Sequence, residues 1–159
     1  GMNVSVVRPC NTYGRRQHPE KVIPKFVRQA VRGEPITVHG DGEGARDWLH
    51  TSDHASAVET VLEHGAAGEA YNLAAGDEHR DIEIAKGILS ITNSQSSITY
   101  IKQRPGHDRR YWMANEKLRG LGWSPSMPFA VGFRDAVLWN VENQDWWERD
   151  DLPVSVCVA

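Results

Sequence analysis

Cysteine is scarce in this chain, and the long apolar runs of membrane proteins are missing. The 159 residues include two cysteines, Cys10 and Cys157, which lie at opposite ends and form no Cys-x-x-Cys pair. This spacing favours neither a zinc site nor a disulfide framework. No apolar run reaches the roughly 20 residues of a membrane span, and no charged start followed by an apolar stretch indicates a signal peptide. We therefore expect a cytoplasmic protein with no membrane partner.

An excess of positive charge is also absent. The formal net charge is -3 and the isoelectric point is about 6.2, which argues against a general nucleic-acid or membrane-surface binder. The hydrophobic fraction of 40% is typical of globular proteins, so extensive disorder is not expected. The length suits one domain with its own core and is too short for two large ones.

The sequence lacks the residue pair that makes a tyrosine basic. A lysine four residues after a tyrosine lowers the pKa of the phenol, because the ammonium group stabilises the phenolate. Other residues stand at this spacing after the four tyrosines: Gln17, Ala75, Arg104 and Asn115. Redox chemistry that depends on such a pair is therefore not expected from this chain alone.

A glycine pattern at residues 40–45 fits the dinucleotide-binding fingerprint only formally. That fingerprint works because a helix N-terminus follows at once and presents free amides to a pyrophosphate. Here Asp41 and Glu43 place two negative charges in the loop, and residues 46–49 are predicted to be extended. We interpret the segment as a turn and expect this chain alone to bind no cofactor.

A metal site is not indicated by the seven histidines. His50 and His54 are four residues apart, but a predicted helix start lies between them, and no His-Glu-x-x-His motif occurs. Trp139, Trp146 and Trp147 could stack on sugars, yet their helical spacing favours a packing role.

Alternating strand and helix patterns predict an α/β fold. The predicted strands cover residues 3–8, 36–39, 70–74 and 98–101. The predicted helices cover residues 21–32, a segment capped by Ser52, and residues 82–91, 115–121 and 129–143. Residues 9–19 are predicted to be a polar loop. The first strand is too apolar to stand exposed, so we expect its edges to be covered.

Polar and cationic side chains recur beside these strands. Asn11 follows the first strand, at the kind of edge where α/β proteins bind ligands. Lys21 begins a helix, where a bound anion would offset the repulsion between its ammonium and the helix dipole. Arg46 follows a flexible turn and can hold a diphosphate through two parallel hydrogen bonds. Arg104 and His107 place a cation and an imidazole on one loop. Singly, each is explained as well by a solvated charge or an ion pair; together they indicate an anion site.

Six short runs carry a family resemblance. In chain order they are RPCNTYG (8–14), PEKVIP (19–24), RDWLH (46–50), YNL (71–73), RPGHDRRY (104–111) and LGWSP (121–125). Together they resemble the C-terminal half of the dTDP-glucose 4,6-dehydratases, which are extended short-chain dehydrogenase/reductases of the NAD-dependent epimerase/dehydratase family. The resemblance covers residues 4–147, and its most specific part is RPGHDRR. It implies a partial Rossmann-like fold, the C-terminal portion of an extended short-chain dehydrogenase/reductase.

The resemblance implies a role for each matching residue. Asn11 would contact the sugar diphosphate, with Lys21 and Val22 beside it. Arg46 would bind the diphosphate, and Asn72 would hold the nucleotide near its ribose or phosphate.

The same resemblance implies contacts at the two ends of the ligand. Arg104 and His107 would close the phosphate and ribose side. Three consecutive residues would line the base: Thr37, Val38 and His39. The family usually has a tyrosine at the His39 position, which stacks on thymine, so the base preference stays open. Thr12 stands where the family has an asparagine that reaches towards the nicotinamide end of NAD.

In the family, the NAD loop, the Tyr-x-x-x-Lys pair and an Asp-Glu acid/base pair all precede the region matched here. We therefore expect a truncated dehydratase-like protein that binds a nucleotide-sugar of the dTDP-hexose class and is inactive alone, whereas the complete family enzyme uses NAD. Residues 3–147 would form the sugar-nucleotide-binding part and residues 148–159 a flexible tail. Residues 1–2 would be a tag scar or start.

Several alternatives remain open. An N-terminal half-enzyme could supply the missing groups, or residues 4–7 of the first strand could pair in a homodimer. The chain could instead be a non-catalytic, self-associating interaction module, or a segment of a longer gene product. Among related activities, the alternative is a sugar-nucleotide epimerase.

Overall fold

The computed structural model describes residues 2–103, 105–106 and 108–148. The strands are β1 (Val6–Pro9), β2 (Asn11–Tyr13), β3 (Ile36–His39), β4 (Ala45–His50), β5 (Ala70–Leu73), β6 (Glu78–Arg80), β7 (Ile98–Ile101) and β8 (Arg110–Tyr111). The helices are α1 (Val22–Val31), α2 (Thr51–His64), α3 (Asp81–Thr92), α4 (Glu116–Arg119) and α5 (Phe129–Glu142), followed by the 3-10 helix η1 (Gln144–Trp146).

The strand pairs join segments that lie far apart in the sequence. β1 pairs with β5, β2 with β4 and β3 with β7, in each case parallel. β4 also pairs antiparallel with β6 and parallel with β8. Parallel pairs connected through helices are the α/β pattern that the sequence predicts, and this prediction is confirmed.

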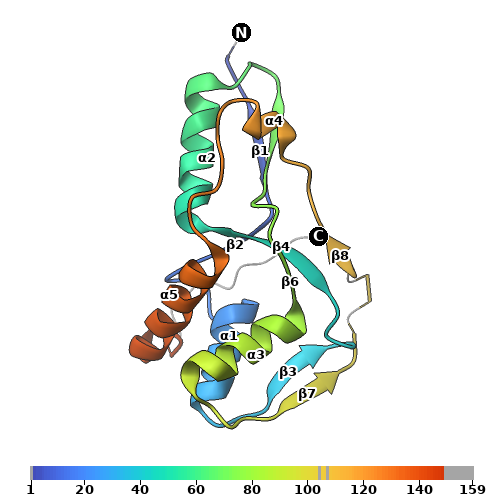
Figure 1. Ribbon diagram of the computed structural model, residues 1–159, viewed down its shortest axis with the longest axis vertical. Coiled ribbons are helices and arrows are strands. Elements are labelled where there is room, and N and C mark those ends of the chain that lie inside the picture. Colours follow the sequence, from blue (N-terminus) through green and yellow to red (C-terminus); the bar gives the residue numbers. More distant parts are fainter. Residues whose placement is uncertain (1, 104, 107, 149–159) are drawn as a thin grey trace.

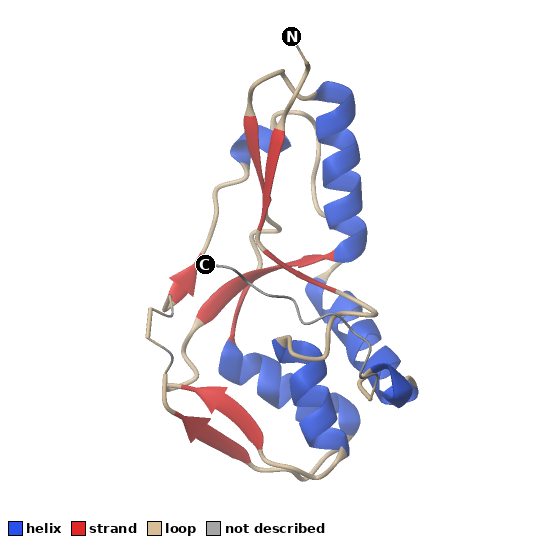
Figure 2. Cartoon of the chain, turned by 180° about the vertical axis from the view of Figure 1, so that it is seen from behind, coloured by secondary structure: helices blue, strands red, loops and turns tan. Residues whose placement is uncertain are grey.

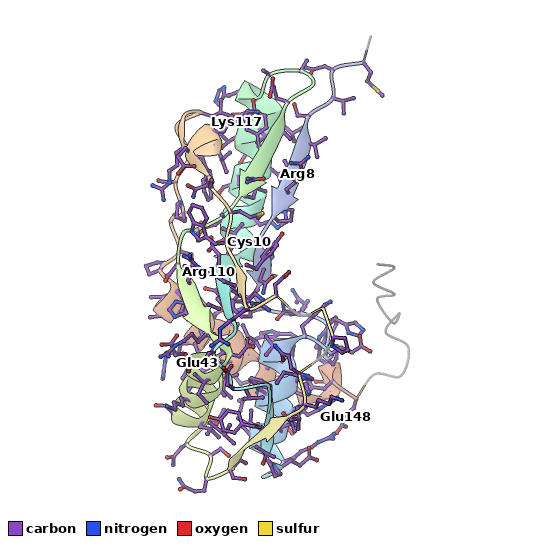
Figure 3. All side chains as sticks on the ribbon, turned by 90° about the vertical axis from the view of Figure 1, so that its right-hand side faces the viewer. Arg8, Cys10, Glu43, Arg110, Lys117 and Glu148 are labelled. Carbon is purple, nitrogen blue, oxygen red and sulfur yellow. The ribbon has the colours of Figure 1, made fainter. Side chains whose placement is uncertain are left out.

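The molecule is elongated, with two halves that meet at β2 and β4. In Figure 1, α2, α4 and β1 lie in the upper half, and α1, α3, β3 and β7 lie in the lower half. Figure 3 keeps the same vertical axis and places Lys117 and Arg8 above Glu43 and Glu148. Each half has its own hydrophobic core.

The lower core lies among α1, α3, α5 and one face of β3. Each of the three helices contributes a fully buried apolar side chain: Val27, Ile88 and Val137. Ile36 and Val38 enter the same core from β3, and Thr37 and His39 fall on the opposite face because strand side chains alternate. Figure 2 shows α1 and α3 packed beside the β3–β7 pair.

The upper core lies among α2, β5 and α4, where Leu73 and Leu118 are fully buried. The first strand is shorter than predicted and begins at Val6. One of its edges is covered by β5, yet Val4 and Val6 remain 48% and 49% exposed. No described helix is both long and apolar enough to cross a membrane.

Three sequence predictions about local structure were wrong. Residues 11–13 form strand β2 within the predicted loop, because pairing with β4 uses backbone groups and needs no apolar side chains. For the same reason the short strands β6 and β8 escaped prediction. Ser52 does not cap α2; the cap is His50, whose ring accepts a hydrogen bond from the Ser52 amide at 3.3 Å.

Candidate functional site

A cavity of about 850 Å³ opens where β2, β3, β4 and the start of α1 come together. This volume is in the range of pockets for small organic ligands. Seven residues proposed from the sequence line it: Asn11, Thr12, Lys21, Val22, Thr37, His39 and Arg46. In Figure 1, β2 lies above α1 and β3 lies beside it. The lining residues come from all three of these elements and from β4.

Cationic side chains of α1 form one wall. Lys21 is the N-cap residue and makes no side-chain cap hydrogen bond, and no acidic residue occupies the first turn. Lys25 and Arg28 follow at spacings of four and three, which places them on the same face of the helix. The amides of a helix N-terminus add positive potential to such a wall. This arrangement suits an anionic group.

Arg46 brings a further cation from β4. It is 9% exposed, and its guanidinium donates hydrogen bonds to Ala45 O at 2.8 Å and to Asp108 O at 2.6 Å. These two carbonyls orient the guanidinium, and arginine keeps its positive charge at any ordinary pH. With Glu20 and Asp81 the only carboxylates among the described lining residues, cations predominate in the cavity.

Neutral polar groups form the part of the wall that comes from β2. The Thr12 hydroxyl lies 3.4 Å from Cys10 O, and 3.0 Å from His54 Nδ1 on α2. Gln17 donates from Nε2 to Thr12 O at 2.9 Å, and it also lines the cavity. Asn11 pairs with Trp48 in the register of β2 and β4.

β3 supplies the lower wall. Thr37 is held by Gln29, which accepts from the Thr37 amide at 3.2 Å and donates to its hydroxyl at 3.1 Å. His39 Nδ1 lies 3.1 Å from Lys102 O, a contact that orients the ring. Val38 is fully buried between them in the lower core, and its side chain does not line the cavity.

The remaining predicted residues lie elsewhere. Asn72 is on β5, where its amide donates to Ala114 O at 3.0 Å, and it is not among the residues of the cavity. Arg104 and His107 lie outside the described residues.

Several lining residues were missed by sequence reasoning. Lys25 and Arg28 could have been found from their helical spacing to Lys21. Gln17 and Trp48 gave no comparable signal. Trp48 also lines a smaller cavity of about 200 Å³, in which Asp53 takes part.

Tyr13 is not prepared to act as a base. It is 1% exposed, and burial raises the pKa of its phenol well above the ordinary value, with Asp77 and Asp53 adding to the effect. The described residues contain no group of three or more His, Cys, Asp or Glu side chains that could hold a metal ion.

The model of the NAD dependent epimerase/dehydratase family matches residues 1–74, a segment that includes all seven predicted lining residues. A dTDP-glucose 4,6-dehydratase of Xanthomonas campestris pv. campestris is 40% identical over 157 residues, which is 92% of this chain and 45% of the relative. The chain is homologous to the C-terminal part of dTDP-glucose 4,6-dehydratases. The resemblance proposed from the six motifs is thereby confirmed.

Solved structures agree with this homology. DesIV, a dTDP-glucose 4,6-dehydratase of Streptomyces venezuelae solved with NAD and TYD bound, aligns with a TM-score of 0.88 and 40% identity. The alignment covers 92% of this chain and 46% of DesIV, and it confirms the partial Rossmann-like fold. RHM3 of Arabidopsis thaliana, a trifunctional protein that includes a UDP-glucose 4,6-dehydratase, is 38% identical over 149 residues, 92% of this chain and 22% of RHM3. This chain spans under half the length of the relatives it matches.

Proposed function

We propose that this chain forms the nucleotide-sugar-binding part of a dTDP-glucose 4,6-dehydratase-like protein, and that its ligand belongs to the dTDP-hexose class. The observation that carries the proposal is the 850 Å³ cavity, in which Asn11 and Lys21 from the N-terminal segment meet Arg46 from β4. Cations on α1 and β4 suit a diphosphate, and neutral groups on β2 and β3 suit a sugar and a base.

The glycine loop at residues 40–45 does not fit the pyrophosphate of NAD. It runs directly into strand β4, so no helix N-terminus follows the glycines at the place where a dinucleotide fingerprint requires one. We therefore assign to this chain no role in the hydride transfer that NAD supplies in the family. Inactivity of the chain alone, its cytoplasmic location and its division into residues 3–147 and a tail at 148–159 remain predictions.

Calorimetric titration tests the proposal. dTDP, UDP and NAD are each titrated into the purified chain and into its Arg46→Ala and Arg134→Ala variants, since Arg134 is an exposed cation on α5. We expect a nucleoside diphosphate to bind and Arg46→Ala to lose about 1–3 kcal/mol, the worth of charge-assisted hydrogen bonds, with Arg134→Ala unchanged. NAD should not bind.

Because Arg46 is buried, its replacement can also unfold the chain. The Arg46→Lys variant keeps the positive charge but loses the planar guanidinium with its parallel donors. Its affinity, together with a thermal melt of each variant, separates loss of the guanidinium contacts from loss of the fold. If neither dTDP nor UDP binds to the folded wild-type chain, the proposal is wrong. If UDP binds better than dTDP, the relative with UDP-glucose activity becomes the better guide to the base.

A second candidate is a self-associating or half-enzyme-binding module. The observation that favours it is that Val6 in β1 and Val4 just before it are half-exposed, so apolar side chains stay in water although β1 pairs with β5. Light scattering on wild type, Val6→Lys and the control Val131→Lys tests it, since Val131 is a similarly exposed valine on α5. A strictly monomeric wild-type chain would exclude self-association.

Among enzymes, the alternative is an epimerase, because the UDP-glucose 4-epimerase of Thermotoga maritima aligns with a TM-score of 0.82 at 28% identity, over 88% of this chain and 46% of the epimerase.

A further inference from the structure

Arg28 lies in the last turn of α1, on the cationic wall of the cavity of about 850 Å³. Its side chain is partly buried, yet it forms no hydrogen bond or ion pair with another described residue. Arg32, one turn further along, is different, because its guanidinium donates to Glu148 at 3.2 Å. A guanidinium carries only donors, so Arg28 has donors available to an oxygen atom of a ligand in the cavity.

Lys21 lies at the other end of the same wall. Arg28 follows it by seven residues, so their Cα atoms lie roughly 10 Å apart along the helix axis. The free amides of the helix N-terminus are at the Lys21 end, which favours a diphosphate there. Arg28 is therefore better placed for another part of a nucleotide ligand.

Gln29, the next residue, joins this end of α1 to β3, which lies beside the helix in Figure 1. It accepts a hydrogen bond from the Thr37 amide at 3.2 Å and donates one to the Thr37 hydroxyl at 3.1 Å. Thr37 and His39 line the cavity from β3, the wall that suits a base under the proposed function. Arg28 thus lies at the end of α1 that is fastened to this wall.

The chemistry of the bases indicates what Arg28 could bind. Thymine and uracil carry exocyclic carbonyl oxygens, which accept hydrogen bonds. Adenine carries an amino group and no carbonyl, so it satisfies the donors of a guanidinium less well. We propose that Arg28 is a specificity-determining residue that donates a hydrogen bond to a carbonyl oxygen of the ligand's base, an inference that rests on the proposed function.

A comparison of two nucleotides isolates this contact. dTDP and ADP are titrated into wild type, Arg28→Ala, Arg28→Lys and the control Arg32→Ala, which removes an arginine of the same helix end that does not line the cavity. We expect Arg28→Ala to weaken dTDP about tenfold, equivalent to about 1.4 kcal/mol, and to leave ADP unchanged. Arg28→Lys should also weaken dTDP, because lysine lacks the planar donors, and Arg32→Ala should change neither nucleotide. Equal weakening of dTDP and ADP by Arg28→Ala, or no effect on dTDP, overturns the proposal.

NMR of dTDP labelled with ¹³C at the base carbonyls reads the same contact in the wild-type chain, so the result does not depend on the folding of a variant. We expect one carbonyl resonance to move downfield on binding, and Arg28→Ala to remove this shift. No shift in the wild-type complex, or a shift that persists in folded Arg28→Ala, overturns the role of Arg28 while the nucleotide site stands. Absence of dTDP and UDP binding by wild type overturns the proposed function and this inference together.

Discussion

Replacing Asp53 should destabilise the protein far more than replacing an exposed acidic residue. Asp53 is 1% exposed in the first turn of α2. Its Oδ1 accepts hydrogen bonds from the Ser126 amide at 3.0 Å and the Ser126 hydroxyl at 2.8 Å, and its Oδ2 accepts from the Met127 amide at 3.0 Å. The carboxylate thus ties α2, in the upper half, to the segment that leads into α5, in the lower half (Figure 1).

The three hydrogen bonds set the size of the effect. Hydrogen bonds to a charged group contribute about 1.5–3 kcal/mol each when buried, but Ser126 is exposed and water can replace part of what it loses. We therefore expect Asp53→Ala to lower the free energy of unfolding by about 2–4 kcal/mol. For a chain of this size that corresponds to a melting temperature lower by about 5–15 °C.

Urea denaturation followed by tryptophan fluorescence measures the loss, with Asp145→Ala as the control, because Asp145 is exposed on η1. Ser126→Ala should cost about 1 kcal/mol in wild type and almost nothing in the Asp53→Ala background, since its hydroxyl bond to Asp53 is then already gone. A loss below about 1 kcal/mol for Asp53→Ala, or additive losses in the double variant, would refute the reasoning.

Gly42→Ala should destabilise more than Gly33→Ala by about 1–3 kcal/mol in urea denaturation: both glycines have positive φ, but a Cβ at Gly42 would meet Ile82, Val38 and Tyr100 within 3.3 Å, whereas nothing lies within 4 Å at Gly33. Burial raises the pKa of the Cys10 thiol to about 12, so peptide-level mass spectrometry should find it unmodified by iodoacetamide at pH 8 until the chain is unfolded in urea. Hydrogen bonds from Lys117 and Arg110 lower the pKa values of Glu69 and Glu78. These two carboxylates therefore stabilise the folded chain above the unfolded pKa of about 4.3, and this stabilisation is lost as pH falls through the folded pKa values. A Glu69→Gln/Glu78→Gln variant should show a shallower fall in melting temperature between pH 5 and pH 3.

The fold was predictable wherever an element buries a periodic apolar face. α1 and α5 lie within a residue or two of their predicted bounds, because their apolar positions recur at helical spacing and enter the lower core. β3 was predictable from its alternation. β2, β6 and β8 were not, because two or three polar residues become a strand only when β4, a distant segment, offers its backbone groups.

The residues of the candidate site also differ in whether a local sequence signal points to them. Lys21 and Arg46 could be proposed singly from charge, and the family motifs added Thr37 and His39, since each of these signals is local in the sequence. The environment of Gln17 has no local signal: its amide is fixed by Thr12, its backbone by Trp146, 129 residues away, and its oxygen is left without a partner only in the folded chain.

The charges of the lining residues explain why the ligand of this cavity needs both an anionic part and a neutral part that forms hydrogen bonds. The cations of α1 and β4 would repel one another if the cavity were filled by an apolar group, and an anion placed among them lowers that repulsion. An anion alone would leave the neutral groups of β2 and β3 unmatched, because Asn11 and Thr37 offer hydrogen bonds that a diphosphate in contact with Arg46 does not use. Inorganic pyrophosphate should therefore bind more weakly than dTDP, and Arg46→Ala should weaken both by the same factor. Equal affinity for the two ligands in calorimetry would mean that the β2 and β3 walls contribute nothing to binding.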